Sequence, residues 1–209
     1  MFGKLRPVMA AVWAAPARAL TAAGVHPNAM TIIGTVGVVF GALFFFPQRG
    51  SMLFWGVMVI TLFVITDMLD GTMARMSGKA SRLGSYLDST LDRVADAAIF
   101  GSLVWAYREV DDLTALAALG CLTIGSFVPY ARAKAESLGI PAKGGIAERS
   151  DRLVIGLTAT GLVGLGLPLW VLTWTLAILA VLGLVTVVQR TIVVIKANAI
   201  DHHLADELR

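Results

Sequence analysis

Long apolar runs alternate with short polar or glycine-rich segments along the whole chain. A helix that crosses a bilayer needs roughly 20 mostly apolar residues. The runs that meet or approach this length cover residues 29–46, 52–74, 84–107, 113–135, 152–167 and 168–194. The last two are divided at Gly164–Pro168, where glycines and a proline predict a tight turn between two helices. The pattern predicts an all-α integral membrane protein with six transmembrane helices.

The first twenty residues predict a different kind of element. Lys4 and Arg6 precede a short apolar run, as in a signal peptide, but Pro16 interrupts the run and Arg18 follows it. The apolar positions recur at roughly helical spacing, at Met9, Val12, Trp13 and Leu20. We therefore expect an N-terminal amphipathic helix that lies in the membrane interface.

The chain contains no internal repeat or interdomain linker, so we expect one domain over residues 1–209. Its predicted parts are a juxtamembrane helix (1–24), a six-helix core (25–196) and a cytoplasmic tail (197–209).

Composition supports the membrane assignment. Hydrophobic residues make up 57% of the chain and charged residues only 15%, against about 25% charged residues in soluble domains. The single cysteine, Cys121, excludes an internal disulfide and is typical of a small core residue.

The basic residues predict the orientation. They gather at one set of helix ends, at Lys4, Arg6, Arg18, Arg75, Lys79, Arg82, Arg132, Lys134, Lys143, Arg149, Arg152, Arg190, Lys196 and Arg209. The opposite connections hold only Arg49 and Arg108. The positive-inside rule therefore places both termini, and the polar segments beside them, in the cytoplasm.

Four carboxylates stand at this cytoplasmic end of the second and third predicted spans. Asp67, Asp70, Gly71 and Ala74 share one helical face, and Gly84, Asp88 and Asp92 share another. Carboxylates crowded together repel unless a cation neutralises them, and oxygen ligands without His or Cys select Mg²⁺, Mn²⁺ or Ca²⁺. Ion pairs with Arg75, Arg82 and Arg93 are the alternative, although arginines do not explain the small residues on the carboxylate face.

These residues resemble a known signature, D-x2-D-G-x2-A-R-x8-G-x3-D-x3-D, which is that of the CDP-alcohol phosphotransferases. Every fixed position is filled here, by Asp67, Asp70, Gly71, Ala74, Arg75, Gly84, Asp88 and Asp92. The resemblance implies two Mg²⁺ or Mn²⁺ ions bound by the four aspartates, with Asp92 as the catalytic base. It also implies that Gly71, Ala74 and Arg75 lie along the CDP moiety of CDP-diacylglycerol, and that the enzyme is a homodimer among membrane lipids.

Three further residues are nucleotide-site candidates by the same resemblance. Asn28 and Thr31 belong to a Pro-Asn-x-x-Thr segment, which also fits a helix start with Asn28 as the cap. Ser81 is similar to a family position that touches the nucleotide, but an ordinary loop serine is the alternative. Asp96 fits no metal position of the signature, and we expect a buried structural hydrogen bond there.

A second, basic cluster indicates a phosphorylated acceptor. Arg149 and Arg152 share a helical face, and guanidinium groups suit phosphate recognition. The cluster consists of Arg132, Lys134, Arg149, Arg152 and Arg190. Ordinary positive-inside charge is the alternative for each of these residues taken singly.

This region is similar to the phosphatidylinositol-phosphate synthases, a bacterial branch of the family. That resemblance implies that inositol phosphate is the acceptor, that Arg132, Arg152 and Arg190 meet its phosphate, and that the protein lies in a bacterial plasma membrane. The sequence departs from the pattern at Pro129, where a serine is expected, and in the exchanged order of Arg132 and Lys134.

Other functions remain open at this point. A sister enzyme would use glycerol phosphate and make phosphatidylglycerophosphate. Membrane prenyltransferases also hold Mg²⁺-diphosphate with aspartates, but they lack the Gly71–Ala74–Arg75 spacing. A divalent-cation transporter would need its carboxylates near the membrane midplane. We expect no nucleic-acid partner.

Overall fold

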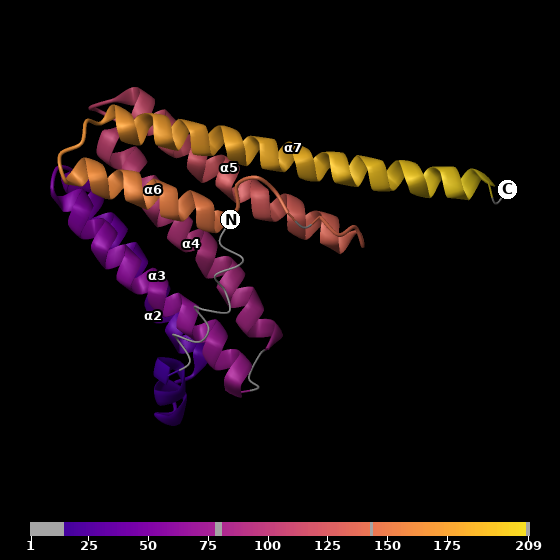
Figure 1. The fold of residues 1–209 in the computed structure, drawn as a ribbon, viewed down its shortest axis with the longest axis horizontal. Helices are drawn as coiled ribbons and strands as arrows, with labels where there is room; N and C mark the ends of the chain where they lie inside the picture. The colour runs from indigo at the N-terminus through magenta and orange to yellow at the C-terminus, as the bar shows by residue number, and fades with distance from the viewer. Residues whose placement is uncertain (1–14, 78–80, 143, 208–209) are drawn as a thin grey trace.

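Six long α-helices make up most of the chain (Figure 1). The computed structural model describes residues 15–77, 81–142 and 144–207, and within these it describes no side chains at 66–71, 74–77 and 200–207. The helices are α2 (Pro27–Phe45), α3 (Met52–Ser77), α4 (Arg82–Tyr107), α5 (Asp112–Ser137), α6 (Arg149–Gly164) and α7 (Trp170–Glu207). A short 3₁₀ turn, η2 (Phe46–Gln48), follows α2. The observed helices begin and end within a few residues of the predicted ones except at the C-terminal end of α7, and the described residues contain no strand.

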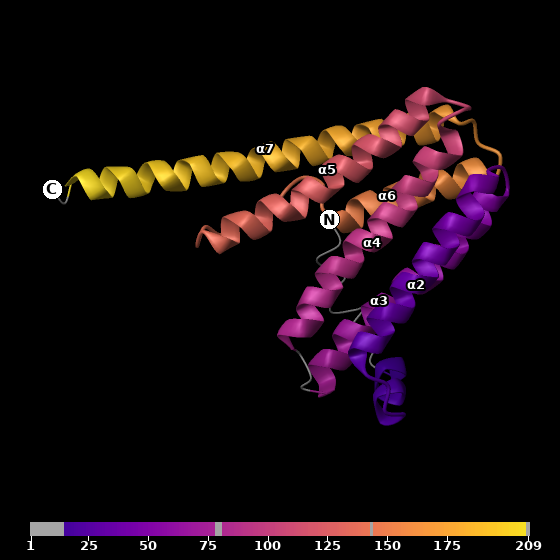
Figure 2. The ribbon, with the colours of Figure 1, turned by 180° about the vertical axis from the view of Figure 1, so that it is seen from behind.

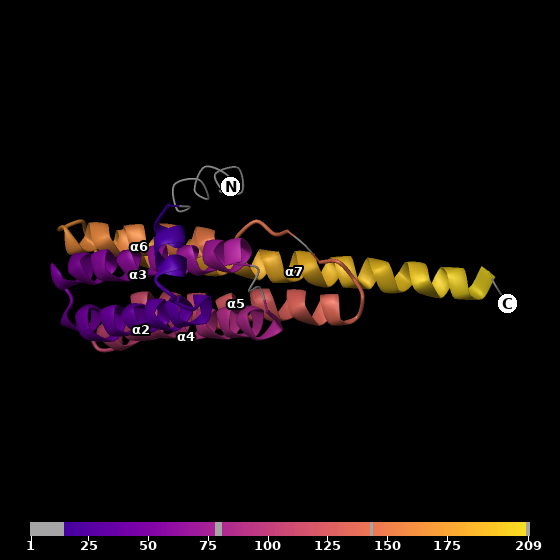
Figure 3. The ribbon, with the colours of Figure 1, turned by 90° about the horizontal axis from the view of Figure 1, so that it is seen from below.

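The helices pack as a ring in two layers. Each packs mainly against two neighbours, in the order α2, α3, α6, α7, α5, α4 and back to α2. Figure 3 shows α3, α6 and α7 in one layer and α2, α4 and α5 in the other. We call the end that holds the three connections after α2, α4 and α6 the outer end, and the opposite end the inner end. Toward the inner end, α5 and α7 diverge from α2 and α3, as Figures 1 and 2 show.

Three of the described helices have the length and composition of membrane helices. Pro27–Gln48, Asp112–Ser137 and Trp170–Ala199 are each long and apolar enough to cross a membrane, and Met52–Ile65 is a shorter apolar segment. Large apolar side chains such as Phe40, Leu116 and Val181 are exposed on their surfaces. An apolar outer surface of this kind is expected where lipid, not water, is the solvent.

Glycines on α2 let it approach α3 closely. A Cβ on Gly37 would overlap the Phe63 ring, and one on Gly41 would stand 3.0 Å from Ile60. Small residues at such contacts are the usual means of close helix packing in membranes. Through the contact between Gly37 and Phe63, α2 packs against the part of α3 that directly precedes the aspartate motif.

The helix starts at the inner end differ in one respect from the prediction. The N-cap of α2 is His26, whose imidazole accepts the N–H of Asn28 at 3.3 Å, and Pro27 begins the helix. The expectation that Asn28 caps this helix is therefore wrong, because the chain is already helical at Asn28. Ser81 caps α4 by accepting the N–H of Gly84 at 3.0 Å.

Part of the predicted N-terminal helix is described. Residues 15–22 are helical, and Ala17 and Leu20 pack against Met73 of α3. Arg18 on the same turn is exposed. The remaining residues of the predicted amphipathic face, Met9, Val12 and Trp13, lie outside the described residues.

Neutral hydrogen bonds join α5 and α7 near the outer end. The hydroxyls of Thr114 and Thr173 lie 2.6 Å apart, and the Cys121 thiol donates to the Leu176 carbonyl at 3.1 Å. Cys121 is buried, as expected for a small core residue.

Candidate functional site

The eight residues of the aspartate signature are divided between two helices. Asp67, Asp70, Gly71, Ala74 and Arg75 belong to the C-terminal part of α3, whose side chains lie outside the described part of the structure. Gly84, Asp88 and Asp92 belong to the N-terminal half of α4, at intervals of one helical turn. The signature thus occupies the inner ends of two antiparallel helices.

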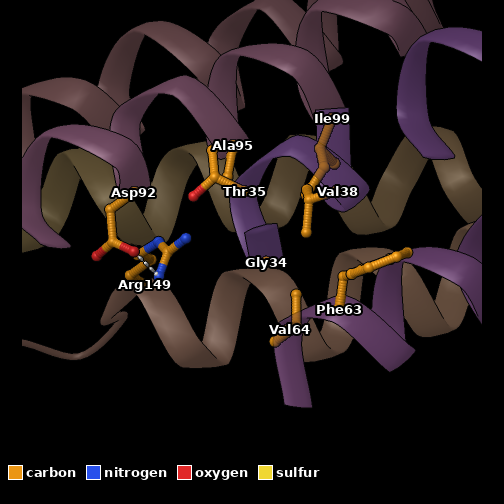
Figure 4. A pocket seen from close by; sticks show the side chains of 9 residues that line it. All are labelled: Gly34, Thr35, Val38, Phe63, Val64, Asp92, Ala95, Ile99 and Arg149. Atoms are coloured by element: carbon orange, nitrogen blue, oxygen red, sulfur yellow. Dashed lines mark ion pairs between the residues drawn. The ribbon is translucent and has the colours of Figure 1, made fainter. Parts of the chain in front are cut away.

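Asp92 lies at the polar end of a small pocket (Figure 4). Its carboxylate is paired with Arg149 Nη1 at 2.5 Å. The rest of the pocket is mainly small or apolar and is lined by Gly34, Thr35, Val38, Phe63, Val64, Ala95 and Ile99. The pocket therefore joins one carboxylate and one guanidinium to an apolar wall built from α2, α3 and α4.

Asp96 is the centre of a buried charge cluster between α4 and α6. It is only 4% exposed, and its two oxygens accept from different arginines. Arg149 Nε donates to Oδ1 at 3.0 Å, and Arg152 Nη2 donates to Oδ2 at 2.7 Å. Arg93 Nη2 lies 3.8 Å from Oδ2 and 3.7 Å from Asp92. The expectation of a buried structural hydrogen bond at Asp96 is confirmed, and its partners are the predicted acceptor arginines.

Arg149 connects two carboxylates of α4, those of Asp92 and Asp96. Its Nη1 pairs with Asp92 while its Nε donates to Asp96, one turn further along the helix. The alternative that aspartates pair with arginines thus holds in part for Asp92. Its partners are Arg149, which lies on another helix, and Arg93.

Arg152 is buried against α5. It is 3% exposed, and its guanidinium rests on Gly125, where a Cβ would stand 2.6 Å from Cζ. Its Nε is buried and has no hydrogen-bond partner among the described residues. Leaving a buried N–H without a hydrogen bond costs free energy, so the Nε of Arg152 could still donate to one further oxygen.

Arg190 is held by backbone carbonyls. Its Nε and Nη2 donate to the Gly144 carbonyl at 3.2 and 3.1 Å, and its Nη1 donates to the Val128 carbonyl. Four residues earlier on α7, Thr186 accepts the N–H of Ala147 at 3.1 Å. These contacts fasten the connection between α5 and α6 onto α7, and so they set the position at which α6 begins.

Arg132 and Lys134 lie at the inner end of α5. Arg132 Nε donates to Glu136 at 2.9 Å, and Lys134 is exposed. Pro129, which departs from the synthase pattern, lies inside α5 without ending the helix. Of the predicted acceptor residues, the structure joins Arg149 and Arg152 directly through Asp96, while Arg132 and Arg190 form other contacts.

The predicted nucleotide residues of the α2 and α4 termini lie together. Asn28 Oδ1 and Ser81 Oγ each lie 3.2 Å from the point where a Cβ on Gly84 would stand. Thr31 is buried one turn into α2 and its hydroxyl donates to the Pro27 carbonyl at 3.3 Å. Gly84 therefore leaves room for the polar groups of two neighbouring segments.

A metal site would have to draw on both signature helices. Among the residues with described side chains, no group of three His, Cys, Asp or Glu is placed to hold a metal ion. Asp88 and Asp92 offer oxygen ligands from adjacent turns of α4, and the side chains of Asp67 and Asp70 on α3 lie outside the described residues. This donor set fits a hard divalent cation.

Two residues of the site were missed by sequence reasoning. Gly125 showed only as a small residue four positions before Pro129, a common helix feature with many causes. Thr186 lay in an apolar run with no motif around it. The position of Asp96, one turn after Asp92 on the same face, was the only signal that could have predicted the charge cluster.

Comparisons with known proteins agree with the signature. Residues 24–145 match the family model described as CDP-alcohol phosphatidyltransferase. A phosphatidylinositol phosphate synthase of Streptomyces avermitilis is 48% identical over 84% of this chain and 75% of its own. One of Cutibacterium acnes is 45% identical over 87% of this chain and 91% of its own.

Solved structures have the same fold. A crystal structure of Mycobacterium tuberculosis phosphatidylinositol phosphate synthase with CDP-DAG bound has a TM-score of 0.81 and 38% identity, covering 88% of this chain and 93% of that one. Another crystal structure of that enzyme, in complex with manganese and citrate, has the same TM-score and identity over 87% and 88% of the two chains.

Proposed function

Because the chain belongs to the CDP-alcohol phosphatidyltransferase family, we propose that it transfers the phosphatidyl group of CDP-diacylglycerol to inositol phosphate. The products would be phosphatidylinositol phosphate and CMP. The carrying observation is that Asp92, the last aspartate of the signature on α4, pairs with Arg149 of the basic helix α6. The signature that would hold the donor and the cations that would hold the acceptor therefore meet at one carboxylate.

The donor side of the site would use both signature helices. Asp67, Asp70, Asp88 and Asp92 would hold two divalent ions, Mg²⁺ or Mn²⁺. When bound, such ions neutralise a diphosphate and stabilise charge on the attacking and leaving oxygens. Gly71, Ala74 and Arg75 would lie along the CDP moiety, with Asn28, Thr31 and Ser81 at its edge.

Asp92 would act as the general base. Its carboxylate accepts the proton of the acceptor hydroxyl, whose oxygen attacks the phosphorus that carries the lipid. The bond from that phosphorus to the CMP oxygen breaks, and CMP leaves. Arg149 holds the Asp92 carboxylate toward α6 and so toward the side from which the acceptor would enter.

The acceptor phosphate would bind the basic cluster of α5, α6 and α7. Arg152 and Arg190 supply buried guanidinium groups, and Arg132, Lys134 and Arg149 supply further charge. The acceptor must place one hydroxyl at Asp92. Arg149 contacts Asp92 directly, and Arg152 is linked to it through Asp96 and Arg149, so both cations are well placed for the acceptor phosphate.

The membrane arrangement follows from the helices and the charges. We propose a single domain of six spans and an interfacial N-terminal helix, in a bacterial plasma membrane, with termini and site on the cytoplasmic side. A homodimer surrounded by membrane lipids would be consistent with the exposed apolar surfaces.

The first experiment identifies the acceptor. Purified protein in detergent with Mn²⁺ or Mg²⁺ and CDP-diacylglycerol should release CMP with inositol phosphate. It should release much less with glycerol phosphate or free inositol. Release with glycerol phosphate alone would replace the proposed product with phosphatidylglycerophosphate. Absence of CMP with every acceptor would overturn the transferase assignment.

The second experiment tests the base. Asp92→Asn should lower kcat by about 10²–10⁴-fold because the amide accepts no proton, while CDP-diacylglycerol binding falls less. Asp112→Asn, at an exposed carboxylate of the outer end, is the matched control and should leave both unchanged. Equal loss of binding and turnover in Asp92→Asn would assign Asp92 to binding alone.

A further inference from the structure

The buried contacts of Arg152 go beyond a simple cationic site. Arg152 lies on α6, but nothing on α6 itself holds its guanidinium in the described structure. Its position is set from two other helices, by Asp96 of α4 at one edge and by Gly125 of α5 against its plane. Asp96 and Gly125, which would not themselves react, thus help to fix the position of the Arg152 guanidinium.

Asp96 fixes more than one cation. Its carboxylate uses one oxygen for Arg152 and the other for Arg149, and Arg149 in turn reaches Asp92. Asp96 therefore links the candidate base to the buried guanidinium, which also packs against Gly125 and the Phe100 ring. Asp96 in this position can align Asp92 with the hydroxyl of a small substrate and Arg152 with the phosphate of the same molecule.

A purely stabilising role explains these features poorly. Burying a carboxylate with several guanidinium groups costs desolvation, and such clusters are weak evidence for stability. Among the described residues, the ion pairs of the cluster join two aspartates to three arginines. The buried Nε of Arg152 has no partner among the described residues, so the cluster is not internally satisfied.

Gly125 leaves the space that the Arg152 guanidinium occupies, and any residue with a side chain would fill that space. A Cβ there would stand 2.6 Å from Cζ and 2.9 Å from both Nη atoms of Arg152. Real Cβ atoms do not approach so closely, so any larger residue must displace the guanidinium plane. Glycine also weakens a helix relative to alanine, so α5 is less stable at this position than alanine would make it.

We propose that Asp96 and Gly125 are positioning residues for acceptor binding, which hold Arg152, and through Asp96 also Arg149, at a set distance from Asp92. This inference rests on the proposed function. It assigns an acceptor-positioning role to Asp96, which the aspartate signature omits, and to Gly125, which lies outside both motifs.

The test compares two substitutions that disturb Arg152 in different ways. Asp96→Asn removes the charge that orients the guanidinium, and Gly125→Ala displaces the guanidinium while all charges remain. Each should raise the KM for inositol phosphate at least tenfold and change the KM for CDP-diacylglycerol less than twofold. Gly156→Ala on α6 is the control, because its added Cβ would make only ordinary contacts, the nearest at 3.8 Å, and its kinetics should match the wild type.

The decisive arm repeats Gly125→Ala in a background that lacks Arg152. In Arg152→Ala the added methyl has no guanidinium to displace, so it should raise the acceptor KM no further. Asp96→Asn should retain part of its effect there, because it also releases Arg149. A full additional effect of Gly125→Ala would overturn the proposal, since residues that act through one partner are not additive.

Thermal unfolding of each variant separates positioning from folding. Gly125→Ala disturbs a buried ion pair, which the helix preference of alanine offsets only in part, so its unfolding temperature should fall less than that of Arg152→Ala while its acceptor KM rises. Parallel loss of stability and of affinity for both substrates would assign Asp96 and Gly125 to the fold alone and overturn the proposal.

Equilibrium binding of inositol phosphate to the same proteins separates this inference from the proposed function. A wild-type protein that binds and turns over, with Asp96→Asn and Gly125→Ala unchanged in acceptor affinity, would overturn the positioning role only. A wild-type protein that neither binds inositol phosphate nor releases CMP would overturn both.

Discussion

The two ends of the helix ring are held together by different chemistry. At the outer end, α5 and α7 are joined by the hydroxyls of Thr114 and Thr173 and by a thiol bonded to a carbonyl. At the inner end, α4 and α6 are joined by the cluster of Asp92, Asp96 and three arginines.

At the outer end, the polar groups described above form hydrogen bonds with nearby groups of the protein. Asp111 caps α5 by accepting the N–H of Thr114 at 2.7 Å, and this hydrogen bond lowers the pKa of its carboxyl below the usual value. Such contacts satisfy the donors that a helix terminus leaves open. They need nothing from a ligand, and we expect them to contribute to stability alone.

The inner end is arranged for a partner outside the chain. Asp96 and Arg152 are buried there, and the Nε of Arg152 has no hydrogen-bond partner among the described residues. Neutral contacts like those at the outer end would join the same helices without the desolvation that buried ions require. The difference indicates that the inner cluster is retained for binding, and substitutions at the two ends should separate stability from substrate recognition.

The largest effect on stability should come from Arg152→Met, which leaves Asp96 buried with one close partner fewer. We expect the free energy of unfolding in mixed micelles to fall by about 3 kcal/mol and the acceptor KM to rise. Arg108→Met at the outer end removes an exposed guanidinium that stacks on Trp105 and should cost about 1 kcal/mol or less. Equal losses in the two variants would remove the distinction between the ends.

Arg190→Gln should have an intermediate effect on stability and a clear effect on binding. The charged donors to the carbonyls of Gly144 and Val128 are lost, which should cost about 1.5–3 kcal/mol. If the same guanidinium binds the acceptor phosphate, the acceptor KM should rise roughly 10-fold or more. Arg190→Lys keeps the charge without the planar fork and should retain part of the acceptor affinity. Unchanged acceptor kinetics in both variants would show that Arg190 only holds the α5–α6 connection in place and does not bind the acceptor.

Thr114→Val should have the smallest effect, confined to stability. The valine removes one buried hydrogen bond, while Thr173 keeps its bond to the Leu169 carbonyl, so we expect a loss of about 1 kcal/mol. Thr158→Val, at an exposed hydroxyl of α6, is the control and should be near neutral. A raised acceptor KM in Thr114→Val would show that the two ends are coupled.

Local sequence was sufficient for the helices and the motif. The positions of α2 to α7 follow from apolar runs and from punctuation such as Gly164–Pro168, because helix formation in an apolar solvent depends on length and composition. The aspartate spacing predicted the family, which the matching family model and relatives confirm. The start of α2 was less predictable, because Asn28 is a preferred capping residue and only the backbone shows that the helix has already begun there.

The partners of the basic residues could not be predicted in the same way. Arg149 and Arg152 are read from the chain as a phosphate-binding face, but their contacts with Asp96 and Gly125 join segments some 25 to 60 residues apart. Such contacts depend on which helices become neighbours in the ring and on their rotation, and each residue's own sequence neighbourhood contains neither. The amino-acid pattern therefore established a membrane helix bundle with an acidic phosphotransferase signature. Only the packing of α4, α5 and α6 decided which buried groups hold its arginines.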